Sequence, residues 1–552
     1  MKNLIKKFSV FVIALMFIAP ACTDLDEELF SEVTADDFFQ TPEEFIAALG
    51  QAYSSMSGMG GSGGLWATNE MASDEIVVTT KGGDWFDGGV LIEIHRHEFT
   101  PDNGFFNNTW GYLYGGIGTT NRLIFQFEEL EAAGNTEAAA FVAELRAVRA
   151  LYYFWALDAF GNVPLSIDFT DESPPANNTD FNAGRLEVYN FIESELNEII
   201  PLLDPASTAN TYGRMNQAAA YALRSKLYLN AKRFTGTKQW LKAAADAKVI
   251  MDGTVGTFGL LPVYSDNFII QNEGSTESIF VIPYDKVFAG GFNWAPMTLH
   301  YANQSTYNFT FQPWNGFSTV EEFYNSYIDP AKNPGPQGPV WTGLAPFDPA
   351  DDKTPNGMGT QDARLSNFLV GPQFNADGSP TEDPAFESET SAAPDPDGTR
   401  LNFTPTINEI HPNGWRQGGA RMGKYEFEIG GTENASNDFV IFRLADIMLT
   451  RAEALWWENN GDAEALSIVN EIRARAGVTL YTSLTADNLF DERGRELFAE
   501  MTRRQDQIRF GKWGDEWWEK VSYTQDGSKY IVFPIPQVAI DASAALTQNP
   551  GF

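Results

Sequence analysis

Cysteine is almost absent from this sequence of 552 residues, in which Cys22 is the only one. A chain with a single thiol can form no intramolecular disulfide, so burial of apolar side chains must hold the fold together. Histidine is also scarce, with four residues in the whole chain. His95 and His97 could share one strand face, but no cysteine lies near them, so we expect no metal site there.

Positive charge is the next scarcity. Lys and Arg number 37 against 74 Asp and Glu, for a formal net charge of −37. Such a chain is not expected to bind nucleic acid or acidic lipid, and long polyanionic ligands are disfavoured. A local cluster at Arg416 and Arg421 could reverse that preference. With 43% hydrophobic and 20% charged residues, the composition is that of a globular protein.

Long apolar runs are missing as well. The apolar stretch at residues 8–18 is shorter than the roughly 20 residues that span a bilayer, and it follows Lys2, Lys6 and Lys7. Small residues then lead into Cys22, so residues 1–21 are expected to be a lipoprotein signal peptide and Cys22 the lipidation site. An ordinary signal peptide with a chance cysteine is the alternative. Removing the three lysines would take the charge from −37 to −40.

An acidic tether is expected at residues 22–35. Its start, Thr23-Asp24-Leu25-Asp26-Glu27-Glu28, resembles the export tag that sends lipoproteins of the Bacteroidetes to the outer face of the outer membrane. A plain solvated tether is the other interpretation, and the two are compatible. The export tag would place the protein at the cell surface, where lipid chains would hold it to the outer membrane.

Helical periodicity dominates the two ends of the remaining chain. Apolar residues at helical spacing predict helices over about 42–57, 112–131, 137–159 and 185–200, whereas residues 65–110 are expected to be irregular. Two segments, 216–251 and 440–476, are typical of helical hairpins with small residues where the helices cross. These hairpins match the tetratricopeptide (TPR) pattern loosely and are not adjacent, so we describe them as TPR-like.

Residues 252–437 lose that periodicity and are rich in Gly, Pro, Asn, Asp and aromatic residues. A structureless loop of this length is implausible, so we expect a loop-rich insertion with short strands, such as one over 279–283. The predicted fold is therefore mainly α, with few strands. One body spans residues 36–552: TPR-like helix pairs form a scaffold over 36–251 and 438–552, and the ligand-binding insertion occupies 252–437.

Several motifs in order along the chain now resemble the SusD/RagB family. They are the sequences LRAVRALYYF at 145–154, FGNVP at 160–164, FRLADIMLTRAEAL at 442–455, VNEIRARAG at 469–477, Glu492-Arg493 with Arg495-Glu496-Leu497, Arg509-Phe510-Gly511, FPIP at 533–536 and QNPGF at 548–552. The sequence departs from the family pattern at one place. Family members often have Glu-Gly, followed by a motif of Arg, two aromatic residues, Asp and Leu. This chain has Glu500-Met501 in place of Glu-Gly, and in place of the following motif it has Arg503-Arg504-Gln505-Asp506-Gln507, which puts the packing of one helix in doubt.

The resemblance implies a helical fold of TPR-like pairs with a loop-rich insertion. It also implies a surface lipoprotein that binds polysaccharide or oligosaccharide, or peptides as in the RagB branch. Such proteins act as a lid over a TonB-dependent, SusC-like transporter of the outer membrane. They are not enzymes, and the resemblance brings no cofactor.

Glycan recognition calls for flat aromatic rings against the apolar face of a sugar and polar side chains around its hydroxyl rim. We expect the ligand to be a neutral glycan, such as a β-glucan, that is bound by side chains of these kinds in the loops. The candidates are Trp85 with Asp84, Trp294 with Asn293, Trp314 with Asn315, and more weakly Trp66 and Tyr301.

The sequence gives little support for catalysis or for a metal site. Residues 60–64 match G-x-S-x-G, but they follow a helix rather than a strand, so no nucleophile elbow is expected. Acidic turns at 348–352 and 395–398 could hold calcium, although turn chemistry explains them as well. Peptide capture and, less favoured, a surface glycosidase remain the alternatives to glycan binding.

Overall fold

The computed structural model describes residues 42–136, 138–206, 210–328, 362–383, 400–524 and 530–552. The chain divides into two compact units, Met1–Ile46 and Ala47–Phe552. Only the first turn of the first described helix falls in the first unit, and everything below concerns the second. The expected signal peptide, the lipidation site Cys22 and the acidic tether lie outside the described residues.

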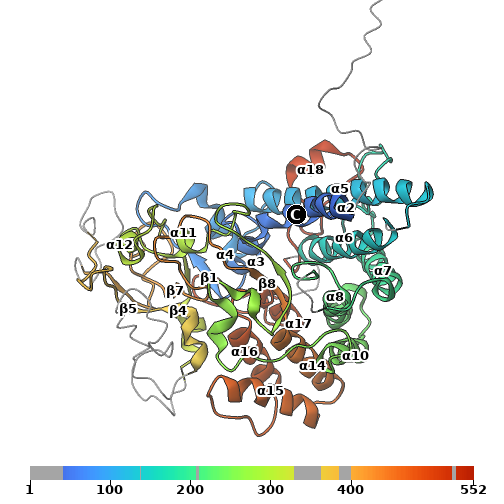
Figure 1. Cartoon of the computed structure of the whole chain (residues 1–552). Helices are drawn as coiled ribbons and strands as arrows, with labels where there is room; N and C mark the ends of the chain where they lie inside the picture. Colours follow the sequence, from blue (N-terminus) through green and yellow to red (C-terminus); the bar gives the residue numbers. More distant parts are fainter. Residues whose placement is uncertain (1–41, 137, 207–209, 329–361, 384–399, 525–529) are drawn as a thin grey trace, which may run out of the picture. The chain divides into compact units, whose positions relative to one another are not determined.

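The described chain is mainly helical, as predicted (Figure 1). The α-helices are α2 (Pro42–Ser54), α3 (Leu65–Met71), α4 (Val90–Arg96), α5 (Gly104–Ala132), α6 (Ala138–Phe160), α7 (Phe181–Ile199), α8 (Gln217–Leu229), α9 (Ala231–Thr235), α10 (Trp240–Met251), α11 (Trp294–Thr298), α12 (Asn303–Tyr307), α13 (Glu321–Asn325), α14 (Leu444–Glu458), α15 (Ala463–Arg475), α16 (Ala486–Glu496), α17 (Arg503–Arg509) and α18 (Gln537–Ala542).

TPR-like helix pairs form the scaffold. Helix α5 packs along α6, α6 along α7, α8 along α10, and α14 along both α10 and α15. Gly116 shows why α5 and α6 approach so closely: a Cβ atom at this position would lie 2.2 Å from Cζ of Tyr152 on α6. One apolar core lies among α14, α15 and α16 and includes Leu449, Trp456, Val469, Ile472 and Leu489.

The expectation that residues 65–110 are irregular is wrong. Helices α3 and α4 lie there, and α5 begins at Gly104 instead of Tyr112. The Asn103 side chain caps α5 by accepting a hydrogen bond from the Phe105 backbone N–H at 3.1 Å. Every residue of α3 is buried, so tertiary packing stabilises a helix too short for its periodicity to show.

Short antiparallel strand pairs accompany the helices in the described ranges. They are β1 (Ile76–Val78) with β3 (Phe317–Thr319), β2 (Ser278–Ile282) with β8 (Phe439–Arg443), β4 (Phe368–Leu369) with β7 (Arg421–Met422), and β5 (Gly371–Pro372) with β6 (Asn402–Phe403). The β2–β8 pair joins residues 278–282, close to the strand predicted at 279–283, to the start of α14. Strands β4, β5 and β7 and helices α11 and α12 lie on the left of Figure 1, away from α7, α8 and α10.

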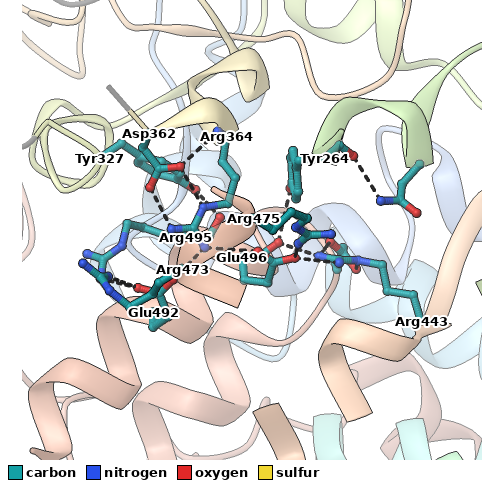
Figure 2. Close-up of polar contacts among 12 residues, drawn as sticks. Tyr264, Tyr327, Asp362, Arg364, Arg443, Arg473, Arg475, Glu492, Arg495 and Glu496 are labelled. Carbon is teal, nitrogen blue, oxygen red and sulfur yellow. Dashed lines mark hydrogen bonds and ion pairs between the residues drawn. The ribbon is translucent and has the colours of Figure 1, made fainter. Parts of the chain in front are cut away.

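A buried network of opposite charges ties α15, α16 and β8 together (Figure 2). The Arg364 guanidinium lies 2.8 Å from Glu492 and 3.1 Å from Glu496, and Arg443 lies 2.7 Å from Glu496. All four side chains are fully buried, and Arg475 also pairs with Glu496. Breaking such a network by removing one partner typically costs about 3–5 kcal/mol, since the other charges stay buried.

The turn before α17 shows how Met501 is accommodated where the family resemblance leads us to expect glycine. Ala499 and Met501 both adopt left-handed backbone conformations, with φ of 58° and 60°. Two buried carboxylates hold them: Glu75 accepts from the Ala499 N–H at 2.7 Å and Glu70 from the Met501 N–H at 2.6 Å. The divergent segment after it forms α17, in which Arg503 pairs with Asp74.

Candidate functional site

A hollow of about 850 Å³ opens among the loops of the predicted insertion and the loop that precedes α4. We call it the Tyr301 hollow. Most of its lining residues are polar, Tyr301 and Phe309 add aromatic rings, and the lining combines residues of four separate chain segments. They are Asp84; His300, Tyr301, Ala302, Gln304, Ser305, Asn308, Phe309 and Gln312; Glu382 and Asp383; and Arg416.

The loop before α4 brings Asp84 and Trp85 to this hollow. The backbone N–H and C=O groups of Lys81 and Asp84 bond to each other at 2.9 and 3.2 Å, which closes a tight turn. Trp85 follows it with φ of 65°, a left-handed conformation that bulky residues rarely adopt. Strain of this kind persists only where surrounding contacts hold it, and it concentrates at binding sites.

Trp85 and Trp314 lie side by side. The Trp85 Nε1–H donates to the Trp314 carbonyl at 2.7 Å, and its ring packs edge-on against Phe317 at 5.9 Å. Gly316 makes this possible, because a Cβ atom there would lie 2.5 Å from Cζ2 of Trp85. Trp314 is half-buried, and within the described chain no aromatic ring stacks on it. Its partly exposed indole makes it a candidate for contact with a sugar.

Tyr301 lines the hollow itself, whereas Trp85 and Trp314 are not among its lining residues and lie close to lining residues in the chain; we call these three residues the aromatic rim. The Tyr301 hydroxyl donates a short hydrogen bond to Asp84, and the Arg416 guanidinium lies over the Tyr301 ring, 4.5 Å from the centroid. Burial, and then the bonded carboxylate of Asp84, raise the pKa of Tyr301 well above its ordinary value. The tyrosine is therefore neutral at physiological pH and acts as a hydrogen-bonding aromatic surface.

The charges at the bottom of the hollow are largely matched. Arg416 Nε lies 2.9 Å from Asp383 Oδ2, and His300 Nε2 lies 3.3 Å from the same oxygen. Burial lowers the pKa of His300 to about 4, although Asp383 opposes the shift. His300 is thus neutral at pH 7. Asp84, Glu382 and Asp383 against Arg416 leave the lining with a formal charge of −2 (1 − 3), which gives acidic glycans no net attraction.

Asn315 supports the hollow from behind. It is fully buried; its Nδ2 donates to the Arg416 carbonyl at 3.1 Å and its Oδ1 accepts from Arg421 at 2.9 Å. Arg421 donates to the same Arg416 carbonyl at 2.7 Å. The prediction that Asn315 contacts ligand is therefore replaced by an indirect role, in which it positions Arg416.

Two predicted stacking residues are in the core. Trp66 and Trp294 are 0% and 1% exposed, and their ring centroids lie 4.9 Å apart. A ring with no accessible face cannot stack on a sugar, so the structure does not support these two predictions. Asn293 is half-buried and lies elsewhere, with its Nδ2 donating to the Glu433 carbonyl at 3.2 Å.

The structure thus gathers Asp84, Trp85, Tyr301 and Trp314 and adds residues that the sequence did not single out as ligands. Arg416 stood out only by its charge. The polar run His300 to Ser305 could have been noticed around Tyr301, because it places a tyrosine close to amide and hydroxyl side chains. Glu382 and Asp383 carried no distinguishing signal in so acidic a chain.

Metal chemistry gains no support from the residues described. No group of three or more His, Cys, Asp or Glu side chains among them is arranged to hold an ion. The two acidic turns considered for calcium, 348–352 and 395–398, lie outside the described ranges. His95 and His97 do not share a strand: His95 lies on α4, and His97 follows it with φ of 57°. None of the described helices combines the length and apolarity needed to span a membrane.

Sequence comparisons find relatives along nearly the whole chain. The SusD family matches residues 276–552, and a family described as starch-binding and associating with the outer membrane matches residues 40–229. The starch-binding protein SusD of Bacteroides thetaiotaomicron is 26% identical over 89% of this chain and 86% of its own length. The SusD-like protein P2 of Formosa agariphila is 22% identical over 92% of this chain and 90% of its own.

Solved structures share the fold. A laminarin-binding SusD-like protein superposes with a TM-score of 0.66 at 20% identity, covering 93% of this chain and all of the other. Surface glycan-binding protein A from Bacteroides thetaiotaomicron, in complex with laminarihexaose, gives 0.66 at 21% identity, with 92% and 99% covered. At these identities the likeness establishes the architecture.

Proposed function

The chain belongs to the SusD family, and we propose that it captures neutral glycan chains at the Tyr301 hollow on the cell surface. The observation that carries the proposal is the aromatic rim beside a polar wall. Tyr301 offers a neutral phenol in the lining, the half-buried Trp314 an indole two residues after the lining residue Gln312, and the wall supplies acceptors such as Glu382 and donors such as Gln304 and Gln312. This combination suits the apolar face and hydroxyl rim of a sugar.

A binding role fits the wall better than catalysis does. Asp84 accepts from Tyr301, and Asp383 lies within ion-pair distance of Arg416. These carboxylates are thus committed to fixing other side chains, whereas glycoside hydrolysis needs a poised acid and a second carboxylate across the scissile bond. We therefore propose that the protein is not an enzyme.

Among glycans, neutral ones are favoured. The formal charge of the whole chain is −37, the lining adds no net positive charge, and Arg416 is already paired. Three of the proteins named above bind starch, laminarin or laminarihexaose, which are neutral glucans. We propose a neutral glucan, with β-glucan first, as the ligand of this chain.

Membrane attachment and delivery complete the proposal. Acyl chains on Cys22 would hold the protein at the outer membrane, and the acidic stretch after it would act as a leash. The partner that receives the glycan would be a TonB-dependent, SusC-like transporter, as the family resemblance implies. One of the matching families is described as associating with the outer membrane, which supports this location.

Affinity gels provide the test. The protein should be retarded by laminarin, soluble starch or mixed-linkage β-glucan and not by alginate, and Trp314→Ala should abolish the retardation. Trp240→Ala is the matched control, since it removes a half-buried indole from α10, outside the hollow. Retardation unchanged in Trp314→Ala would contradict the site. Binding of peptides, with none of the glycans retarding the protein, would contradict the glycan assignment.

A further inference from the structure

A second hollow, of about 760 Å³, shares no lining residue with the Tyr301 hollow. It lies where a tight turn at Trp518 and Glu519 approaches the C-terminal end of α4 and the N-terminal end of α13. We call it the Trp518 hollow. Its lining consists of Arg96, Glu98, Glu322 and residues 516–521.

Helix α4 holds this turn in an unfavourable backbone conformation. Trp517 and Lys520 exchange backbone hydrogen bonds at 3.3 and 2.9 Å, and Glu519 between them has φ of 61°. A left-handed conformation costs a non-glycine residue about 1–2 kcal/mol. Arg96 offsets that cost by donating from Nε to the Glu519 carbonyl at 3.2 Å and from Nη2 to its carboxylate at 2.7 Å. His95 Nε2 donates to the Trp518 carbonyl at 2.7 Å.

The two indoles of the turn have different surroundings. Trp517 is packed: Lys520 Nζ lies 3.9 Å from its ring centroid, and His97 meets it edge-on at 5.0 Å. Its buried Nε1 has no hydrogen-bond partner in the part of the chain that is described. Trp518 is half-buried, and across the same ranges the only ring near it is His95, edge-on at 6.0 Å. Trp518 therefore lines the hollow with no described ring stacked on it.

Three exposed carboxylates surround this indole. Those of Glu98, Glu322 and Glu516 form no ion pair with any described residue, so their oxygens are available to accept hydrogen bonds. Arg96 is engaged by Glu519, and Lys520 donates to the Asp515 carbonyl at 2.6 Å. The backbone of the turn is bonded within itself and offers no strand edge to an extended peptide. An accessible indole with acceptors around it matches the ring face and hydroxyls of a sugar.

We propose that the Trp518 hollow is a second glycan-binding site, which stacks a sugar ring on Trp518 and accepts hydroxyl hydrogen bonds at Glu98, Glu322 and Glu516. The inference rests on the proposed function, because the ligand is the same neutral glycan. Gln312 of the Tyr301 hollow and Glu322 of the Trp518 hollow are ten residues apart, so their Cα atoms are separated by at most ~36 Å. One polysaccharide chain can therefore engage both hollows, and the second contact raises retention of polymer through effective concentration.

The experiment compares a polymer with a short oligosaccharide. Trp518→Ala should weaken retention in a gel of the polysaccharide that binds the wild type by at least ~3-fold, whereas calorimetric binding of its trisaccharide at the Tyr301 hollow stays unchanged. Trp518→Phe, which keeps a ring, should retain most of the polymer binding, and Trp240→Ala should behave as wild type. Glu98→Gln/Glu322→Gln should weaken polymer retention without touching the turn, which covers the case in which Trp518→Ala fails to fold.

The outcomes separate the two proposals. Polymer retention that is unchanged in both Trp518→Ala and Glu98→Gln/Glu322→Gln overturns the second site and leaves the Tyr301 hollow as the glycan site. A wild-type protein retarded by no neutral glycan overturns both. If an immobilised Lys- and Arg-rich peptide captures the wild type but not Trp518→Ala, while gel retention is unaffected, the hollow is a peptide site and the glycan inference is wrong.

Discussion

Replacing Glu492 by glutamine tests whether the buried charge network stabilises the scaffold through its ionised form. Glu492 is fully buried and lies 2.8 Å from Arg364 and 2.9 Å from Arg495. Burial alone would raise the pKa of its carboxyl group, but the charges of Arg364, Arg495 and Arg473 outweigh burial and lower the pKa from 4.5 to about 2.

The sign of the effect follows from linkage. A carboxyl group whose pKa is lowered by folding contributes stability above its unfolded pKa and loses it as pH falls towards the folded pKa. A shift from 4.5 to about 2, at 1.36 kcal/mol per pKa unit, is worth ~3.4 kcal/mol at pH 7 and ~1.4 kcal/mol at pH 3. An unfolding entropy of ~2.1 cal/mol/K per residue gives ~1 kcal/mol/K for a body of roughly 500 residues.

Differential scanning calorimetry at constant ionic strength is the assay. Glu492→Gln should unfold ~3 °C below the wild type at pH 7 and only ~1 °C below it at pH 3. Glu471→Gln, which changes an exposed residue of α15 with no ion pair in the described ranges, should show no difference at either pH. If the difference in unfolding temperature between Glu492→Gln and the wild type is the same at both pH values, or larger at pH 3, the prediction is wrong, because the carboxylate charge is then not what stabilises the network.

Two further predictions concern a buried indole and the anchor. Trp294→Ala removes a core ring that packs on Trp66, Phe292 and Tyr425, so the free energy of unfolding should fall by about 3–5 kcal/mol while the folded protein still binds glycan. Calorimetry measures the stability and affinity gels measure the binding. Loss of glycan binding with an unchanged unfolding temperature would show that Trp294 belongs to the binding site. Cys22→Ala should bind glycan in solution but leave the membrane fraction and fail to support glycan uptake by cells, and normal uptake would show that the transporter alone retains the protein.

The scaffold was largely predictable from the sequence, because helix pairs carry their own periodicity. Helices α6, α8, α10, α14 and α15 lie close to where apolar spacing placed them. Short buried helices such as α3 were not predictable, since seven residues give no clear period and their stability comes from neighbours distant in the sequence. The signature residues Arg475, Glu492 and Glu496 turned out to be members of the buried ionic network, a role that the motif did not reveal.

The site was predictable by residue type but not by burial. Trp85 and Trp294 both follow glycine-rich stretches, and nothing local distinguishes them. The difference arises from tertiary partners: Trp294 packs on Trp66, whereas Trp85 is tied to the Trp314 carbonyl at the edge of the hollow. Arg416 likewise belongs to the site only because Asn315 and Arg421 hold its carbonyl.

The central claim is that the aromatic rim of the Tyr301 hollow binds a neutral glycan. Isothermal titration calorimetry measures this directly, with a hexasaccharide of the retarding polysaccharide titrated into the wild type and into Tyr301→Ala/Trp314→Ala at matched folded concentration. The account predicts saturable binding by the wild type and at least a 100-fold loss, ~2.7 kcal/mol, in the double variant. Equal affinities for the two proteins would contradict it.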